Sequence, residues 1–139
     1  MPSPAQWLAC SAGIIGLLGA LHLLYTFHGT KLRPRDTHLE RQMNLVSPEI
    51  SRHTTMWNAW VGFNASHGFG ALFFALVYGY LALLEAPFLF HSKYLLGIGL
   101  LLLLGYAWLG FRYWFRIPIA GILLALGCYA IALWQAWAA

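Results

Sequence analysis

The sequence predicts an all-α fold, a bundle of four transmembrane helices, from three observations. Only 9% of its 139 residues are charged and 60% are hydrophobic, whereas soluble domains carry about 25% charged residues. Eight of the 12 charged residues fall in one segment, between Lys31 and Arg52. The rest of the chain contains four long apolar stretches without strand-like alternation, which favours helices over a β-barrel. The length predicts a single membrane domain, residues 1–139.

Each apolar stretch is long enough to cross a bilayer core of ~30 Å, which takes about 20 helical residues. The predicted helices are residues 6–28, 57–84, 93–112 and 117–137. Charged or proline-containing segments separate them: Arg33-Pro34-Arg35-Asp36, Glu85-Ala86-Pro87 and Arg116-Ile117-Pro118. The third connection is so short that the last two helices must form an antiparallel hairpin, with Pro118 in a helical first turn.

The distribution of lysine and arginine predicts the orientation in the membrane. Five basic residues lie in the first loop, residues 29–56, two lie beside the third connection, and Lys93 lies in the second. Because basic residues concentrate in cytoplasmic loops, we expect the first and third loops in the cytoplasm and both termini on the extracytoplasmic side. The predicted location is a bacterial inner (plasma) membrane. Because membrane topology accounts for the basic residues, the sequence predicts no nucleic-acid partner.

The first loop is expected to contain a short amphipathic helix on the membrane surface. Asp36 is a good capping residue. Three apolar residues that follow it share one helical face: Leu39, Met43 and Val46. Further along, Ser47-Pro48-Glu49 combines a capping hydroxyl, a first-turn proline and an acid in the first turn. This signal predicts that the second transmembrane helix begins near Pro48, before the apolar stretch itself.

Polar side chains inside a bilayer are costly, so each is a candidate for function. Asn64 and His67 lie three residues apart in the second stretch and therefore on one helical face. His22 lies near the cytoplasmic end of the first stretch, and the antiparallel connectivity brings the 112–116 segment to the same side. The predicted ligand-binding residues are His22, Tyr25, Asn64, His67, Arg112, Tyr113 and Arg116.

Two interpretations of these residues need no cofactor. In the first, they bond across helices and hold a structural or partner-binding subunit together, each bond contributing about 0.6 kcal/mol on average. In the second, they form a pocket open to the cytoplasm or inner leaflet for a lipid-like amphiphile, whose anionic head group the arginines hold. We favour this pocket and a non-enzymatic protein with membrane lipids as partners, because the apolar stretches contain no carboxylate for acid–base chemistry.

A third interpretation is a haem or metal protein. His22 and His67 would be axial ligands of a b-type haem, or would join His28 in a metal site. Their depths in the membrane differ by about one helical turn. The sequence has no CxxCH motif and no cysteine–histidine spacing typical of zinc sites. No cofactor is therefore favoured, and haem b is kept as the alternative.

The apolar stretches contain both cysteines of the chain and several glycines. Cys10 and Cys128 each lie inside such a stretch, where we expect buried thiols rather than a disulfide framework.

The first two stretches contain glycines at positions 13, 16, 19, 62, 68 and 70. Glycines allow close helix packing, and the first helix is the surface through which we expect a homodimer. The Gly97-Ile98-Gly99 segment is expected to be lipid-facing or structural.

Three segments of the chain resemble a family of small bacterial four-helix integral membrane proteins whose function is unassigned. They are Gly29-Thr30-Lys31-Leu32, Met56-Trp57-Asn58-Ala59-Trp60-Val61-Gly62-Phe63-Asn64-Ala65-Ser66-His67 and Tyr113-Trp114-Phe115-Arg116-Ile117-Pro118. The resemblance extends over most of the chain. It implies a four-helix membrane protein and supplies no mechanism.

Overall fold

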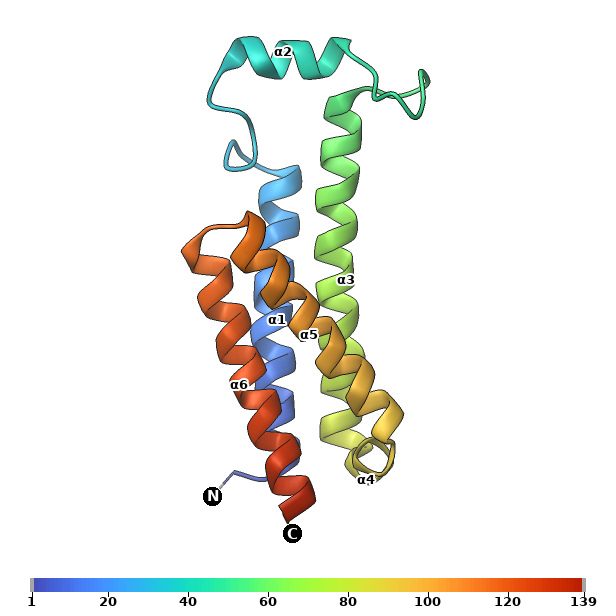
Figure 1. Cartoon of the computed structure of the whole chain (residues 1–139), viewed down its shortest axis with the longest axis vertical. Helices are drawn as coiled ribbons and strands as arrows, with labels where there is room; N and C mark the ends of the chain where they lie inside the picture. The colour runs from blue at the N-terminus through green and yellow to red at the C-terminus, as the bar shows by residue number, and fades with distance from the viewer. Residues whose placement is uncertain (1, 139) are drawn as a thin grey trace. The chain divides into compact units, whose positions relative to one another are not determined.

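The structure is a computed structural model that describes residues 2–138, and it contains helices and no β-strand among these residues. Four long helices are α1 (Pro4–Phe27), α3 (Met56–Leu84), α5 (Lys93–Tyr113) and α6 (Arg116–Ala138) (Figure 1). Two short helices are α2 (Thr37–Leu45) and α4 (Ala86–His91). The four long helices are long and apolar enough to cross a membrane. The predicted all-helical class, with four helices able to span a membrane, is therefore confirmed.

The helix boundaries lie within two residues of those predicted from the apolar stretches. This agreement has a simple cause, because prolines and charged residues stop an apolar helix at places that are visible in the sequence. The segment 85–92 was expected to be only a break, yet it contains α4, whose Leu89 is fully buried. Ser92 then caps α5 by accepting a hydrogen bond from the Leu95 amide at 3.3 Å.

The start of α3 differs from the prediction that placed it near Pro48. The helix begins at Met56, and Thr55 is its cap: the Thr55 hydroxyl oxygen accepts the Asn58 amide hydrogen at 3.2 Å. Pro48 instead begins a turn, in which its carbonyl oxygen accepts from the Ser51 amide at 3.2 Å. The Met56 amide donates to the Val46 carbonyl at 2.8 Å. This bond closes the segment 46–56 into a loop and prevents α3 from extending back to Pro48.

The two possible caps can be compared by mutation. Thr55→Ala should lower the free energy of unfolding by about 1 kcal/mol, because an amide at the start of α3 loses its side-chain acceptor. The matched change Ser47→Ala should alter it by less than about 0.5 kcal/mol. Unfolding by SDS titration in mixed micelles, followed by far-UV circular dichroism, measures both. Equal losses in the two variants would contradict the assignment of Thr55 as the cap.

The chain forms two compact units. The bundle unit consists of residues 2–18 and 71–138, and the loop unit consists of residues 19–70. The bundle unit contains the beginning of α1, the second half of α3, and α4, α5 and α6. The loop unit contains the end of α1, the first loop with α2, and the first half of α3.

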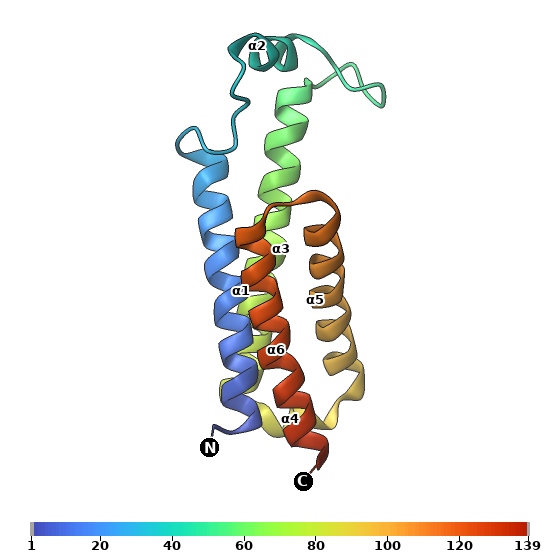
Figure 2. The same cartoon turned by 60° about the vertical axis from the view of Figure 1, so that its left-hand side comes forward.

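In the bundle unit, segments of α1, α3, α5 and α6 run side by side around an apolar core (Figure 2). Three aromatic residues form its centre. Phe74 stacks on Tyr78 with ring centroids 4.6 Å apart, and the fully buried Tyr129 lies at an angle to both rings. Both tyrosine hydroxyls donate to carbonyl oxygens of α5, Tyr78 to Leu95 at 2.7 Å and Tyr129 to Leu96 at 2.9 Å. The tyrosines thus tie α3 and α6 to α5.

Glycine positions show where helices approach closely. A Cβ atom added at Gly99 would lie 2.7 Å from Tyr78 Cε1 and would also collide with the Tyr129 hydroxyl, whereas one at Gly97 would meet open space. Gly99 is therefore structural and Gly97 is not. In the loop unit, a Cβ at Gly68 of α3 would lie 2.6 Å from Leu23 Cγ of α1. The close approach predicted from glycine is found there, while Gly62 faces open space.

In the loop unit, α2 lies crosswise to the ends of α1 and α3 (Figure 1). Asp36 caps α2 as predicted, since its carboxylate oxygen accepts from the His38 amide at 2.8 Å. No residue of α2 is buried. Large apolar side chains in and after this helix are exposed: Leu39, Leu45, Val46 and Ile50.

Candidate functional site

The loop unit brings together three of the predicted site residues. The His22 ring of α1 and the His67 ring of α3 meet edge to face, with centroids 4.9 Å apart and an angle of 71° between their planes. His22 Nε2 lies 3.1 Å from Asn64 Oδ1. The contact between α1 and α3 at these residues depends on how the helices are rotated, which the sequence could not reveal.

The hydrogen bonds around Asn64 define its orientation and the state of His22. Asn64 Nδ2 donates to the Trp60 carbonyl oxygen at 2.8 Å, so the Asn64 oxygen is the atom that faces His22. Because an amide oxygen only accepts, His22 Nε2 carries the hydrogen and donates it. Thr26 also donates from its hydroxyl to the His22 carbonyl at 2.7 Å. Asn64 therefore holds the His22 ring in one tautomer.

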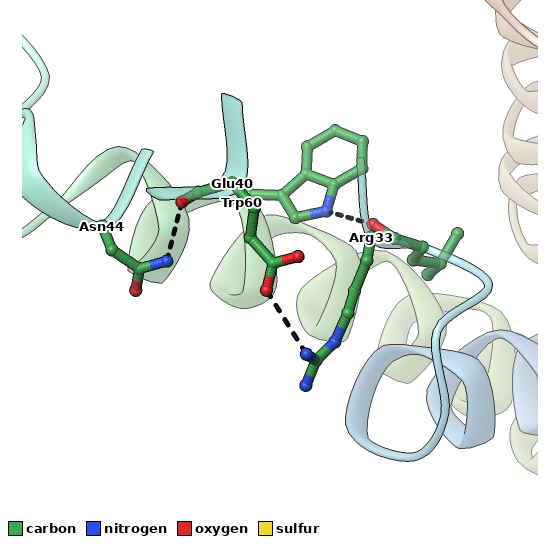
Figure 3. Close-up of polar contacts among 5 residues, drawn as sticks. Arg33, Glu40, Asn44 and Trp60 are labelled. Carbon is green, nitrogen blue, oxygen red and sulfur yellow. Dashed lines mark hydrogen bonds and ion pairs between the residues drawn. The ribbon is translucent and has the colours of Figure 1, made fainter. Parts of the chain in front are cut away.

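An open hollow lies next to this cluster, between the end of α1, the first loop and the start of α3. Its volume is about 40 Å³, room for about three water molecules and far below the ~300 Å³ of a pocket that encloses a whole small molecule. One wall is held by the Trp60 indole, which donates to the Leu32 carbonyl at 3.0 Å (Figure 3). The lining residues are Tyr25, Thr26, Phe27, Gly29, Leu32, Arg33, Trp57, Trp60, Val61 and Asn64.

Arg33 supplies the positive charge of the hollow. Its Nη1 lies 3.3 Å from a carboxylate oxygen of Glu40 in α2 (Figure 3), and its guanidinium lies 5.9 Å from the Trp57 ring centroid. The Arg33 side chain is 52% exposed. Close by in the chain, the Lys31 ammonium lies 4.2 Å above the ring of Tyr25, another lining residue. Two cationic side chains, of Arg33 and Lys31, therefore lie near the aromatic rings of Trp57 and Tyr25, which line the hollow.

The predicted site residues divide between the two units. Tyr25 and Asn64 line the hollow, and His22 and His67 adjoin Asn64 in the loop unit. Arg112, Tyr113 and Arg116 belong to the bundle unit, where they are exposed at the turn between α5 and α6. The Arg112 guanidinium lies 5.8 Å from the Tyr113 ring centroid.

Of the residues that line the hollow, the sequence predicted only Tyr25 and Asn64. The charged and indole side chains that it missed are Arg33, Trp57 and Trp60. Arg33 was interpreted only as a topology signal, and the two tryptophans were not among the predicted site residues. A usable signal existed, since a basic loop residue and an aromatic pair flank the two apolar stretches that carry His22 and Asn64. This signal does not, however, indicate which arginine of the first loop lies against the hollow.

The haem alternative can be tested against the geometry of the two histidines. Two imidazoles that ligate one haem would have to stand on opposite faces of the macrocycle, each with a ring nitrogen turned to the iron. The His22 and His67 rings are in direct edge contact, which leaves no room for a macrocycle between them, and His22 Nε2 is bonded to Asn64. As arranged, the pair does not fit a haem. Among the described residues, no group of three or more His, Cys, Asp or Glu side chains is placed to hold a metal ion.

No protein-family model, no curated protein and no solved structure matches this chain. The function is therefore argued from the geometry of the site and from the four apolar helices, which give the chain the architecture of a multi-pass membrane protein.

Proposed function

We propose that this protein binds the anionic head group of a membrane lipid in the hollow of the loop unit. The observation that carries the proposal is the position of Arg33, which lines an open hollow together with aromatic side chains and the amide of Asn64. The proposal includes the orientation inferred from the basic residues, with the first loop in the cytoplasm of a bacterial cell. The head group would then belong to a lipid of the inner leaflet.

The chemistry of Arg33 suits a phosphate. Arginine presents five N–H donors in a planar fork that matches phosphate oxygens, which is more than its contact with Glu40 uses. The neighbouring Lys31 adds a second positive charge, and cationic side chains attract anionic lipids at the membrane surface. Glu40 is the opposing group, because its carboxylate competes with an anion for the same guanidinium.

The size of the hollow restricts what enters it. A volume of about 40 Å³ admits a phosphate-sized group and excludes acyl chains. The chains would remain in the bilayer, against apolar side chains of the same unit that are more than half exposed, namely Leu24, Phe27 and Phe63. Trp57 and Trp60 lie at the level of the head group, where tryptophan is favoured at membrane interfaces. In this arrangement the protein binds only the head group, and the acyl chains of the lipid stay in the bilayer.

The exposed apolar residues of the first loop support a location of α2 at the same membrane surface. Ile50 is 94% exposed and Leu45 is 71% exposed, which is unfavourable in water and favourable at a lipid interface. The ion pair between Arg33 and Glu40 connects α2 to the hollow. We infer that α2 lies on the inner leaflet and keeps Arg33 close to lipid phosphates.

Replacing Arg33 tests this function directly. Arg33→Gln should weaken the binding of phosphatidylglycerol about tenfold, because a charge-assisted hydrogen bond contributes on the order of 1.5 kcal/mol. Arg52→Gln is the matched control: it removes the same charge from the same loop at a residue that does not line the hollow. Native mass spectrometry of the purified protein, titrated with phosphatidylglycerol in mild detergent, measures both, with phosphatidylcholine as the uncharged comparison.

A substitution at Glu40 should change phosphatidylglycerol binding in the direction opposite to Arg33→Gln. Glu40→Gln frees the Arg33 guanidinium from a competing carboxylate and should strengthen phosphatidylglycerol binding about two- to fivefold, as expected for a partly exposed ion pair. Equal weakening by Arg33→Gln and Arg52→Gln would mean that only the total loop charge matters. If neither variant changes lipid retention while both stay folded, the polar residues serve packing and the proposed function is wrong.

A further inference from the structure

We propose that Cys10 and Cys128 form a reversible disulfide that joins α1 to α6. The two residues are 118 positions apart in the sequence, yet their sulfur atoms lie 3.9 Å apart inside the bundle unit. Both thiols are free in the structure. This contact is independent of the lipid site, since neither cysteine belongs to the loop unit. The sequence predicted a buried thiol at each position; this is confirmed for Cys128 and wrong for Cys10, which is exposed.

The sulfur atoms need only a short movement to bond. A disulfide has an S–S length of about 2.05 Å, so the two sulfurs must approach by less than about 2 Å. Cys10 is exposed on α1, which leaves its side chain free to rotate, while Cys128 is buried on α6. The helices are also in contact elsewhere: a Cβ added at Gly121 of α6 would lie 2.9 Å from Leu18 Cδ1 of α1. The packing of α1 on α6 therefore already brings the two sulfurs close to bonding distance.

Buried polar atoms without a partner occur on the two helices that carry the cysteines. Trp7 Nε1 and Ser11 Oγ of α1 and Gln135 Oε1 of α6 are buried without a hydrogen-bond partner in the protein. Trp7 precedes Cys10 by three residues and Ser11 follows it by one, while Gln135 lies two helical turns after Cys128. Because buried polar groups nearly always have a partner, we infer that water reaches this end of the bundle unit. Water lets a thiol ionise to the nucleophilic thiolate.

The reaction is a thiol–disulfide exchange with a small disulfide oxidant, R–S–S–R. The exposed Cys10 thiol loses its proton and attacks one sulfur of the oxidant, which forms a mixed disulfide and expels one RS⁻ that is protonated to RSH. The Cys128 thiol then loses its proton and attacks Cys10 Sγ, which expels the second RSH. The two protein thiols are oxidised by two electrons, and one R–S–S–R is reduced to two RSH.

The cross-link should stabilise the bundle unit. Joining two residues so far apart restricts the unfolded chain, and long closed loops gain most from such a bond. We expect the oxidised protein to have a Tm higher than the reduced protein by about 5 °C or more. Reduction with dithiothreitol should reverse the change.

The test uses the full chain in mild detergent with 4,4′-dithiodipyridine, a neutral disulfide that enters micelles. Wild type should release two thiopyridones per chain, lose about 2 Da in intact mass and carry no adduct, because both thiols end in one intramolecular bond. Cys10→Ser and Cys128→Ser are the matched controls. Neither single variant can form the bond, so neither should lose the 2 Da, and each should retain the circular dichroism spectrum of wild type.

Three results would overturn the proposal. In the first, folded wild type keeps two thiols that a maleimide alkylates after the oxidant treatment. In the second, a stable pyridyl adduct remains on Cys10, which would show that Cys128 cannot reach the mixed disulfide. In the third, the only disulfide links two chains and persists in Cys128→Ser. None of these readings depends on lipid binding, so failure here leaves the proposed function unaffected.

Discussion

Replacing Tyr129 by alanine should lower the free energy of unfolding by about 3–5 kcal/mol, the largest effect expected for a single change in this protein. Tyr129 is fully buried, contacts the rings of Phe74 and Tyr78, and donates to the Leu96 carbonyl. Alanine removes all three interactions and leaves a cavity between α3, α5 and α6. SDS titration in mixed micelles, followed by far-UV circular dichroism, measures the loss.

Two further variants separate the causes. Tyr129→Phe keeps the ring and removes the hydroxyl, so it should cost only about 1 kcal/mol. Trp134→Ala removes a larger side chain from the same helix, but Trp134 is 71% exposed, and its loss should cost less than about 0.5 kcal/mol. If Trp134→Ala destabilised the protein as much as Tyr129→Ala, burial in this core would not be what holds the bundle unit together.

Gly99→Ala should lower the free energy of unfolding by about 1–3 kcal/mol, the cost typical of forcing an extra methyl group into a packed core. The new Cβ would meet the Tyr129 hydroxyl and would lie 2.7 and 2.9 Å from Tyr78 Cε1 and Cζ. Both tyrosines must then shift away from the α5 carbonyls to which they donate. The same SDS titration measures the effect.

The control for this prediction lies two residues away on the same helix. A Cβ at Gly97 meets open space, so Gly97→Ala should leave the stability unchanged or raise it by up to about 1 kcal/mol through helix propensity. Combining Gly99→Ala with Tyr129→Phe should cost less than the sum of the single changes, because the phenylalanine lacks the oxygen that meets the new methyl group. Strict additivity would show that the two side chains do not touch.

The lengths and breaks of the helices were predictable because they depend on local chemistry. A run of about 20 apolar residues has few alternatives to a membrane helix, and a proline or a group of charges ends it. The start of α3 shows the limit of this reasoning. Ser47-Pro48-Glu49 is a good local start signal, but the Met56 amide donates to the Val46 carbonyl, and Thr55 is the cap instead. A contact ten residues away overrides the local preference.

The candidate site was predictable in part. His22, Asn64 and His67 stand out in the sequence because polar groups are rare and costly in apolar helices. Their mutual contact was not predictable, since it depends on which sides of α1 and α3 face each other. Arg33 was missed for a related reason. Five basic residues lie in the first loop, and only the folded loop places Arg33 between Glu40 and Trp57.

The all-helical class, the four apolar helices with their ends, and the few polar residues inside them can all be derived from the amino-acid sequence. Contacts between side chains of different helices become visible only in the folded protein: Tyr78 and Tyr129 over Gly99, Cys10 beside Cys128, and His22 against Asn64 and His67. The physical reason is that the four long helices are almost uniformly apolar around their circumference. Lipid is as apolar as leucine, so hydrophobicity does not distinguish a packed face from a lipid-facing one. The packing instead depends on the fit between helix surfaces, on small residues that let helices approach, and on a few hydrogen bonds between helices. These contacts exist only once the helices are together.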